Sequence, residues 1–104
     1  VANLYVLISV SDPAQYAEAW TRMIGGTDMG ETDTVLISMS AGGLGRTTHV
    51  AAVSGKSVGT VMSQMNANRS EETFQTFLEE VRDIRTIEQN IVTVDMAVFG
   101  NMGG

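Results

Sequence analysis

The chain has 104 residues, enough for one small hydrophobic core, and we expect a single domain over residues 1–104. Apolar residues make up 43%, but no apolar run approaches the roughly 18–20 residues that cross a bilayer, so we expect no membrane span. The formal charge is −6, with six scattered basic side chains against twelve acidic ones, which argues against nucleic acid as a partner.

The chain contains no cysteine, which excludes disulfides and thiolate chemistry. With a single histidine besides, we expect no metal site. No charged segment followed by an apolar core opens the sequence, so we expect no secretory signal and a cytoplasmic protein.

The first predicted elements are a strand over residues 4–10 and a helix that begins at Pro13. The segment "LYVLISV" is typical of a strand buried on both faces. Asp12 can cap the helix, with a glutamine three residues later as in a capping box, and Gly25-Gly26 ends it. Helical spacing places four apolar residues on one face: Tyr16, Trp20, Met23 and Ile24.

Residues 34–41 ("TVLISMSA") and 47–54 ("TTHVAAVS") predict two further strands, joined by "AGGLGR". A glycine-rich phosphate loop requires a helix after it, whereas a strand follows here. We therefore interpret the glycines as hairpin residues. The acidic segment "TDMGETD" before these strands lacks the spacing of a calcium loop and is expected to be solvated.

The second half predicts two helices and a last strand. A short helix begins near Ser57, and a longer one is capped by Ser70 and ends near Arg85. Residues 90–99 ("NIVTVDMAVF") then alternate as a strand, with successive side chains on opposite faces.

The order β-α-β-β-α-β predicts an α+β, ferredoxin-like fold with a four-stranded antiparallel sheet and its helices on one face. Apolar residues of both parities predict that the other face is also covered, most simply by a second copy of the chain across a two-fold axis. We therefore expect a homodimer through the sheet faces. The residues behind this expectation are Tyr5, Leu7, Leu36, Ala51, Val53, Ile91, Ala97 and Phe99.

The element order and the segment "SEETFQTFLEEV" (residues 70–81) resemble the dimeric α/β-barrel superfamily, in particular its antibiotic-biosynthesis-monooxygenase and stress-responsive branches. The resemblance implies a dimeric α/β barrel with a pocket in each subunit, between helices and sheet, for a small apolar or aromatic molecule. In monooxygenase-like members the substrate itself forms the reactive carbanion, so no metal or prosthetic group is needed. That branch typically has asparagine, tryptophan or histidine around the pocket, and in this chain only Trp20 and His49 match these residue types.

The inner faces of the predicted helices are either ordinary core or the wall of an adaptable cavity. The seven methionines suit the second interpretation, because unbranched thioether side chains accommodate acyl chains and aromatic rings of varied shape. The candidate ligand-binding residues are Tyr16, Trp20, Met23, Met62, Met65, Phe74, Phe77 and Leu78.

Two polar residues on strands are candidates for chemistry. His49 is the candidate general base or carboxylate anchor, and a structural histidine of the sheet is the alternative. Asp95 interrupts an apolar strand and, if buried, needs a partner such as Arg46, His49, Tyr5 or a residue of the second subunit.

The leading hypothesis is a homodimeric protein that binds a small apolar or amphipathic molecule, fatty-acid-like or aromatic. The alternative is a cofactor-independent monooxygenase or isomerase acting on an aromatic or polyketide-like substrate, with His49 as its base. A structural domain with a closed pocket is a third possibility.

Overall fold

The computed structural model describes residues 1–39 and 45–96. Seven elements follow one another along the chain, and the second helical region is divided in two. They are β1 (Ala2–Val10), α1 (Pro13–Gly26), β2 (Asp33–Ser38), β3 (His49–Gly55), α2 (Val58–Asn68), α3 (Glu72–Val81) and β4 (Arg85–Val94). This order confirms the α+β, ferredoxin-like fold.

The sheet has the order β2-β3-β1-β4, and every neighbouring pair is antiparallel. β2 and β3 pair from Asp33↔Ser54 to Ser38↔His49, which confirms the predicted hairpin. Gly45 has a φ of +63°, the backbone conformation for which a hairpin glycine was expected. Residues 41–44 of the predicted connection lie outside the described part of the chain.

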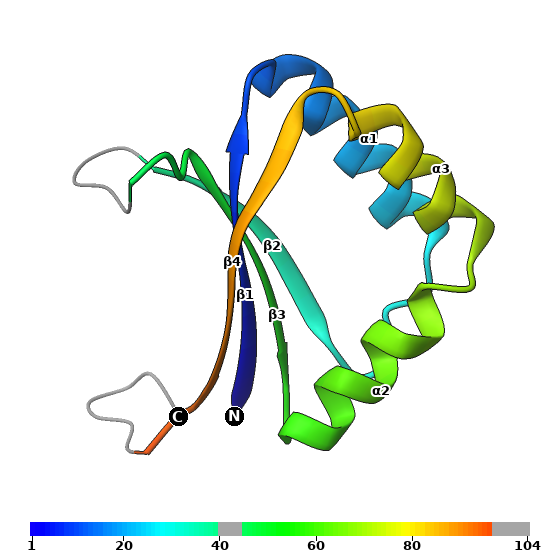
Figure 1. Ribbon diagram of the computed structural model, residues 1–104. Coiled ribbons are helices and arrows are strands. Elements are labelled where there is room, and N and C mark those ends of the chain that lie inside the picture. The colour runs from blue at the N-terminus through cyan, green and yellow to red at the C-terminus, as the bar shows by residue number, and fades with distance from the viewer. Residues whose placement is uncertain (40–44, 97–104) are drawn as a thin grey trace.

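All three helices cover one face of the sheet, called here the helix face (Figure 1). Even-numbered residues of β1 point to this face, and Ile8 and Val10 pack there with the buried side of α1 and α3. α1 begins as predicted, because Pro13 is its first residue. The Asp12 carboxylate accepts a hydrogen bond from the backbone N–H of Gln15 at 3.1 Å. Ser57 caps α2 in the same way, through the Thr60 amide at 3.1 Å.

Within residues 1–39 and 45–96, no helix covers the other face of the sheet, called here the open face. The strand register places on it seven residues with apolar or aromatic side chains: Tyr5, Leu7, Val35, Ile37, Val50, Ala52 and Ile91. Of the residues expected on a second apolar face, Leu36, Ala51 and Val53 instead belong to the helix face. Ala97 and Phe99 lie outside the described residues.

The prediction for α3 and β4 was wrong at four boundaries, the two ends of each element. Ser70 does not cap α3, because its hydroxyl donates to the Ala67 carbonyl, and Glu71 stands at the N-cap without a side-chain hydrogen bond. α3 ends at Val81 rather than near Arg85, and β4 begins at Arg85 rather than at residue 90.

Two physical reasons explain why α3 ends and β4 begins earlier than predicted. Ile84 reaches the core from a turn, in which its amide donates to the Val81 carbonyl, so its helical spacing does not require a helix. Arg85 then pairs with Val10, and the strand continues through the polar segment 88–90, because edge-strand pairing uses backbone groups. β4 ends at Val94, before the predicted residue 99.

Within the described residues, no helix is long and apolar enough to cross a membrane.

Candidate functional site

A cavity of about 350 Å³ lies between the helix face of the sheet and the three helices. β1, β2, β3 and β4 supply its floor, and α1, α2 and α3 supply its wall. Every candidate ligand-binding residue lines it: Tyr16, Trp20, Met23, Met62, Met65, Phe74, Phe77 and Leu78. The structure thus brings together side chains that are up to 62 positions apart in the sequence, from position 16 to position 78.

One part of the wall is an aromatic cluster. The Phe77 ring meets Tyr16 edge-on at a centroid distance of 5.6 Å and Trp20 edge-on at 6.0 Å. Tyr16 and Trp20 stack at 6.5 Å, and Phe74 lies 6.3 Å from Phe77. Such pairs contribute stabilisation beyond burial alone and favour defined ring orientations on this side of the cavity.

Methionine side chains make up another part of the wall. They come from α1, from the loop before β2 and from α2: Met23, Met29, Met62 and Met65. Met29 could not be predicted as a lining residue, because nothing in an acidic loop indicates that its one apolar residue turns inward. A cavity with aromatic and flexible thioether walls can adapt to ligands of different shape.

The polar groups of the cavity are few. Thr34, Asn68 and Asn90 line it, and Arg69 and Arg85 are its only charged lining residues among those described. Asn68 is almost fully buried, and its side chain accepts from Gln64 Nε2 at 2.8 Å and donates to Met29 Sδ at 3.5 Å. The buried Nε of Arg85 has no hydrogen-bond partner.

Arg85 was missed because the sequence placed it at the end of a helix. As the first residue of β4 it pairs with Val10, whose side chain belongs to the helix face, so Arg85 shares that face. Burial raises the pKa of the Tyr16 hydroxyl above 10.0, and the positive charge and hydrogen bonding of the Arg85 guanidinium offset part of the rise. The two side chains are therefore neighbours in the cavity wall.

His49 lies on the helix face but is not among the residues that line the cavity. It pairs with Ile8 at the start of β3, and its ring centroid is 6.4 Å from that of Tyr16. Its Nδ1 shares a hydrogen bond of 2.8 Å with the Thr48 hydroxyl, which also accepts from the Val10 amide at 2.9 Å. The parity expected for His49, Ala51 and Val53 is confirmed by the register.

Asp95 is exposed and lies just beyond the end of β4. Its carboxylate accepts from Asn3 Nδ2 at 3.2 Å, so its partner is none of the residues proposed for it. Asn3 also donates to Thr93 Oγ1 and accepts from Ser54 Oγ, which builds a polar cluster on the open face. The carboxylate can interrupt the apolar pattern because it stands outside the strand, in water.

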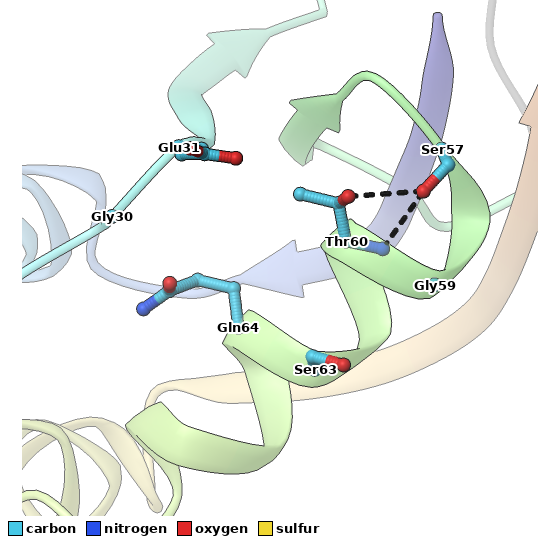
Figure 2. Close-up of a pocket in the computed structure, with 7 residues that line it drawn as sticks. All are labelled: Gly30, Glu31, Ser57, Gly59, Thr60, Ser63 and Gln64. Atoms are coloured by element: carbon cyan, nitrogen blue, oxygen red, sulfur yellow. Dashed lines mark hydrogen bonds between the residues drawn. The ribbon is translucent and has the colours of Figure 1, made fainter.

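A second, shallow depression lies where the loop before β2 meets the start of α2 (Figure 2). Ser57 already accepts from the first-turn amide of Thr60, and the Glu31 carboxylate faces the depression and pairs with Lys56 at 3.6 Å. Capped amides and a nearby carboxylate make a poor anion site. No cluster of three potential metal ligands occurs within residues 1–39 and 45–96.

No protein-family model and no curated protein matches the sequence. Solved structures match its fold. HapK from Hahella chejuensis is similar with a TM-score of 0.61 and 11% identity, over 96% of this chain and 97% of HapK. Protein Atu4242 from Agrobacterium tumefaciens is similar with a TM-score of 0.63 and 11% identity, over 90% and 92% of the two chains.

A third similar structure is a Chloroflexus aurantiacus protein described as an antibiotic biosynthesis monooxygenase. Its TM-score is 0.59 and its identity 13%, over 96% of this chain and 98% of that one. At these identities the likeness concerns the fold alone. It confirms the predicted likeness in fold to antibiotic biosynthesis monooxygenase proteins.

Proposed function

We propose that this protein binds a small apolar or amphipathic molecule in the cavity between its helices and its sheet. The observation that carries the proposal is the cavity itself, about 350 Å³ in volume and walled by an aromatic cluster and four methionines. A chain that only needed a core would gain stability by filling this space, because interiors normally pack without such voids.

The size and the walls restrict the ligand. Small-molecule sites typically measure about 300–1,000 Å³, so this cavity suits a ligand at the small end, such as a medium-length acyl chain or a single aromatic system. Met62, Ile87 and Val92 line the cavity yet are each more than 40% exposed, which supports an entrance between α2 and the β4 edge. An apolar ligand body would cover these side chains.

The same proposal includes a homodimer formed through the open face. Val35 and Ile37 are 50% and 43% exposed on this face in a single chain, and Tyr5 lies on the same face. A contiguous apolar sheet face is a common mark of an interface, and a two-fold contact would cover it with the same surface of a second copy. The lack of cysteine is compatible with a reducing compartment, and we place the dimer in the cytoplasm.

Binding can be measured through Trp20, the only tryptophan, which lies in the cavity wall. Native mass spectrometry with solvent extraction identifies any molecule that copurifies with the protein, and a panel of acyl and aromatic compounds is then titrated against Trp20 emission. We expect a copurified molecule or saturable binding with a dissociation constant in the micromolar range. No copurified molecule and no binding across the panel would contradict the function.

Two neighbouring alanines of β3 provide a matched control for where the ligand binds. Ala51 lines the cavity and Ala52 lies on the open face, and both are buried. Ala51→Leu fills cavity space and should weaken binding by tenfold or more, whereas Ala52→Leu should leave the affinity within about twofold. Equal loss in both variants would place the ligand elsewhere.

A cofactor-independent monooxygenase or isomerase for an aromatic or polyketide-like substrate is the second candidate. Two observations favour it: His49 is on the helix face 6.4 Å from Tyr16, and a protein described as an antibiotic biosynthesis monooxygenase has a similar fold. In this case His49 would act as the general base. Oxygen uptake with an activated phenol, lost in His49→Ala, would support it, and uptake that survives the substitution would remove His49 from the mechanism.

A further inference from the structure

The charge of the cavity is opposite to the charge of the chain. Acidic side chains outnumber basic ones by twelve to six, yet the two charged residues that line the cavity in the described part of the chain are both arginines. No aspartate or glutamate of residues 1–39 and 45–96 lines it. An apolar enclosure that contains only positive charge favours a ligand with a negative charge.

Arg85 is the arginine whose surroundings require an explanation. The described chain contains three ion pairs, Arg22–Glu80, Lys56–Glu31 and Arg82–Glu79, and Arg85 takes part in none of them. Its Nε is buried without a hydrogen-bond partner. A buried donor on a cation costs free energy unless an acceptor reaches it, and a carboxylate offers two oxygens that match the planar guanidinium.

The two arginines that line the cavity differ in their exposure to water. Arg69 is exposed at the end of α2, where water can solvate its charge, and it follows the buried Asn68. Arg85 instead lies beside the Tyr16 hydroxyl, and Tyr16 is 1% exposed. The Arg85 Nε that lacks a partner is therefore at the Tyr16 side of the cavity, next to the aromatic cluster.

We infer that the ligand is a small carboxylate-headed amphipathic molecule, whose carboxylate pairs with Arg85 while its apolar body lies along the aromatic and methionine walls. The inference rests on the proposed binding function and adds the charge and the orientation of the ligand. The Tyr16 hydroxyl is a second donor for the same carboxylate. Because burial raises its pKa, this hydroxyl stays protonated at neutral pH and can donate.

The test compares octanoate with 1-octanol, which share the apolar body and differ in the charged head. Both compete with the neutral fluorescent probe N-phenyl-1-naphthylamine for the wild-type protein at pH 7.5. A hydrogen-bonded ion pair predicts that octanoate binds about tenfold or more tightly than octanol. The preference should fall in high salt, and it should disappear in Arg85→Met while octanol affinity stays within about threefold.

Arg82→Met is the matched control, because Arg82 is exposed, pairs with Glu79 and does not line the cavity. It should keep the full preference for octanoate. Arg85→Lys keeps the charge but loses the planar fork of donors, so it should keep part of the preference.

Each outcome distinguishes the inference from the function on which it rests. If neither the probe nor either competitor binds, the proposed function fails. If octanol and octanoate bind the wild-type protein equally, the cavity binds a ligand but Arg85 does not select a carboxylate, and the inference is overturned. Circular dichroism checks that Arg85→Met is folded, and if it is not, the wild-type octanoate-to-octanol ratio and its salt dependence decide alone.

Discussion

The two faces of the sheet are built from the same four strands and are both apolar, but the chain covers only one of them. On the helix face, apolar side chains of β1 meet α1 and α3, and the space left over is a cavity lined by Arg85, whose Nε is buried. The open face is apolar along the edge strand β2, where Val35 and Ile37 are exposed, and polar at one end of β1 around Asn3. Two apolar faces of one sheet can therefore serve different purposes, one as the wall of a cavity and the other as the proposed dimer interface.

The largest effect should come from removing apolar volume on the helix face. Ile8 is 1% exposed within the main core, and Ile8→Ala should lower the free energy of unfolding by about 2–5 kcal/mol. Ile37→Ala removes the same atoms from the open face, where the side chain is 43% exposed in one chain. It should cost less than about 1 kcal/mol in dilute protein, as surface substitutions do.

Chemical denaturation at several protein concentrations separates these two contributions. The Ile8→Ala loss should not depend on concentration, whereas any Ile37→Ala loss should grow as the dimer forms, because association adds to apparent stability. Similar losses at every concentration would show that the two faces are equally part of one monomeric core.

The second prediction uses two valines with nearly the same exposure on opposite faces. Val35 on the open face is 50% exposed and Val92 at the cavity entrance is 48% exposed. Val35→Lys places an unpaired charge in the proposed interface and should raise the dimer dissociation constant about 100-fold. Val92→Lys should leave the dimer intact and weaken binding of N-phenyl-1-naphthylamine several-fold, since it removes apolar contact area.

Sedimentation velocity measures the dimer dissociation constant of both variants, and titration with the probe measures their affinity for it. A wild-type protein that sediments as a monomer at micromolar concentration would refute the homodimer. A dimer lost equally in both variants would refute the assignment of the interface to the open face.

Much of the fold could be predicted because its signals are local. Asp12 and Pro13 mark the start of α1 through capping and a fixed φ, and the strand pattern over residues 47–54 indicates a hairpin after β2. The parity of His49 followed from strand alternation alone. Choosing which face it occupies required the register with β1, which depends on residues more than 40 positions away.

The candidate site was only half predictable for the same reason. Apolar lining residues follow from helical spacing, which is why the aromatic and methionine walls were found. Arg85 could not be found, because helical spacing as far as Ile84 placed it at the end of a helix, and its position on the helix face depends on its pairing with β1. Strand alternation places Val92 and Asn90 on the helix face. Continuing this alternation back along the chain would lead to Arg85 only if the irregularity near residue 88 were known.

A third, smaller effect concerns the two tyrosines, one on each side of the sheet. Burial raises the pKa of Tyr16 above 10.0, so its neutral form is favoured in the folded state. Its contribution to stability is therefore complete below pH 10.0 and is lost as the pH rises through the higher folded pKa, because the unfolded chain releases its proton first.

Urea denaturation between pH 8 and pH 11 tests this dependence. The wild-type free energy of unfolding should fall in the alkaline part of the range, and Tyr16→Phe should flatten the fall. Tyr5→Phe on the open face is the matched control, because it removes a tyrosine and leaves Tyr16 in place. An alkaline fall that is the same in wild type and Tyr16→Phe would contradict the role of burial.

The smallest effect compares the starts of two helices that lie on the same face. Asp12 caps α1 through the Gln15 amide, whereas Glu71 occupies the N-cap of α3 in an extended conformation and makes no cap hydrogen bond. Glu71→Asp shortens the side chain to capping length and keeps its charge, so it should stabilise the protein by about 0.5–1 kcal/mol. Glu72→Asp, one position inside the helix, should give no such gain. Because both positions belong to the helix side, thermal denaturation should show the gain while the dimer dissociation constant stays unchanged, and a gain accompanied by tighter dimers would contradict the separation of the two faces.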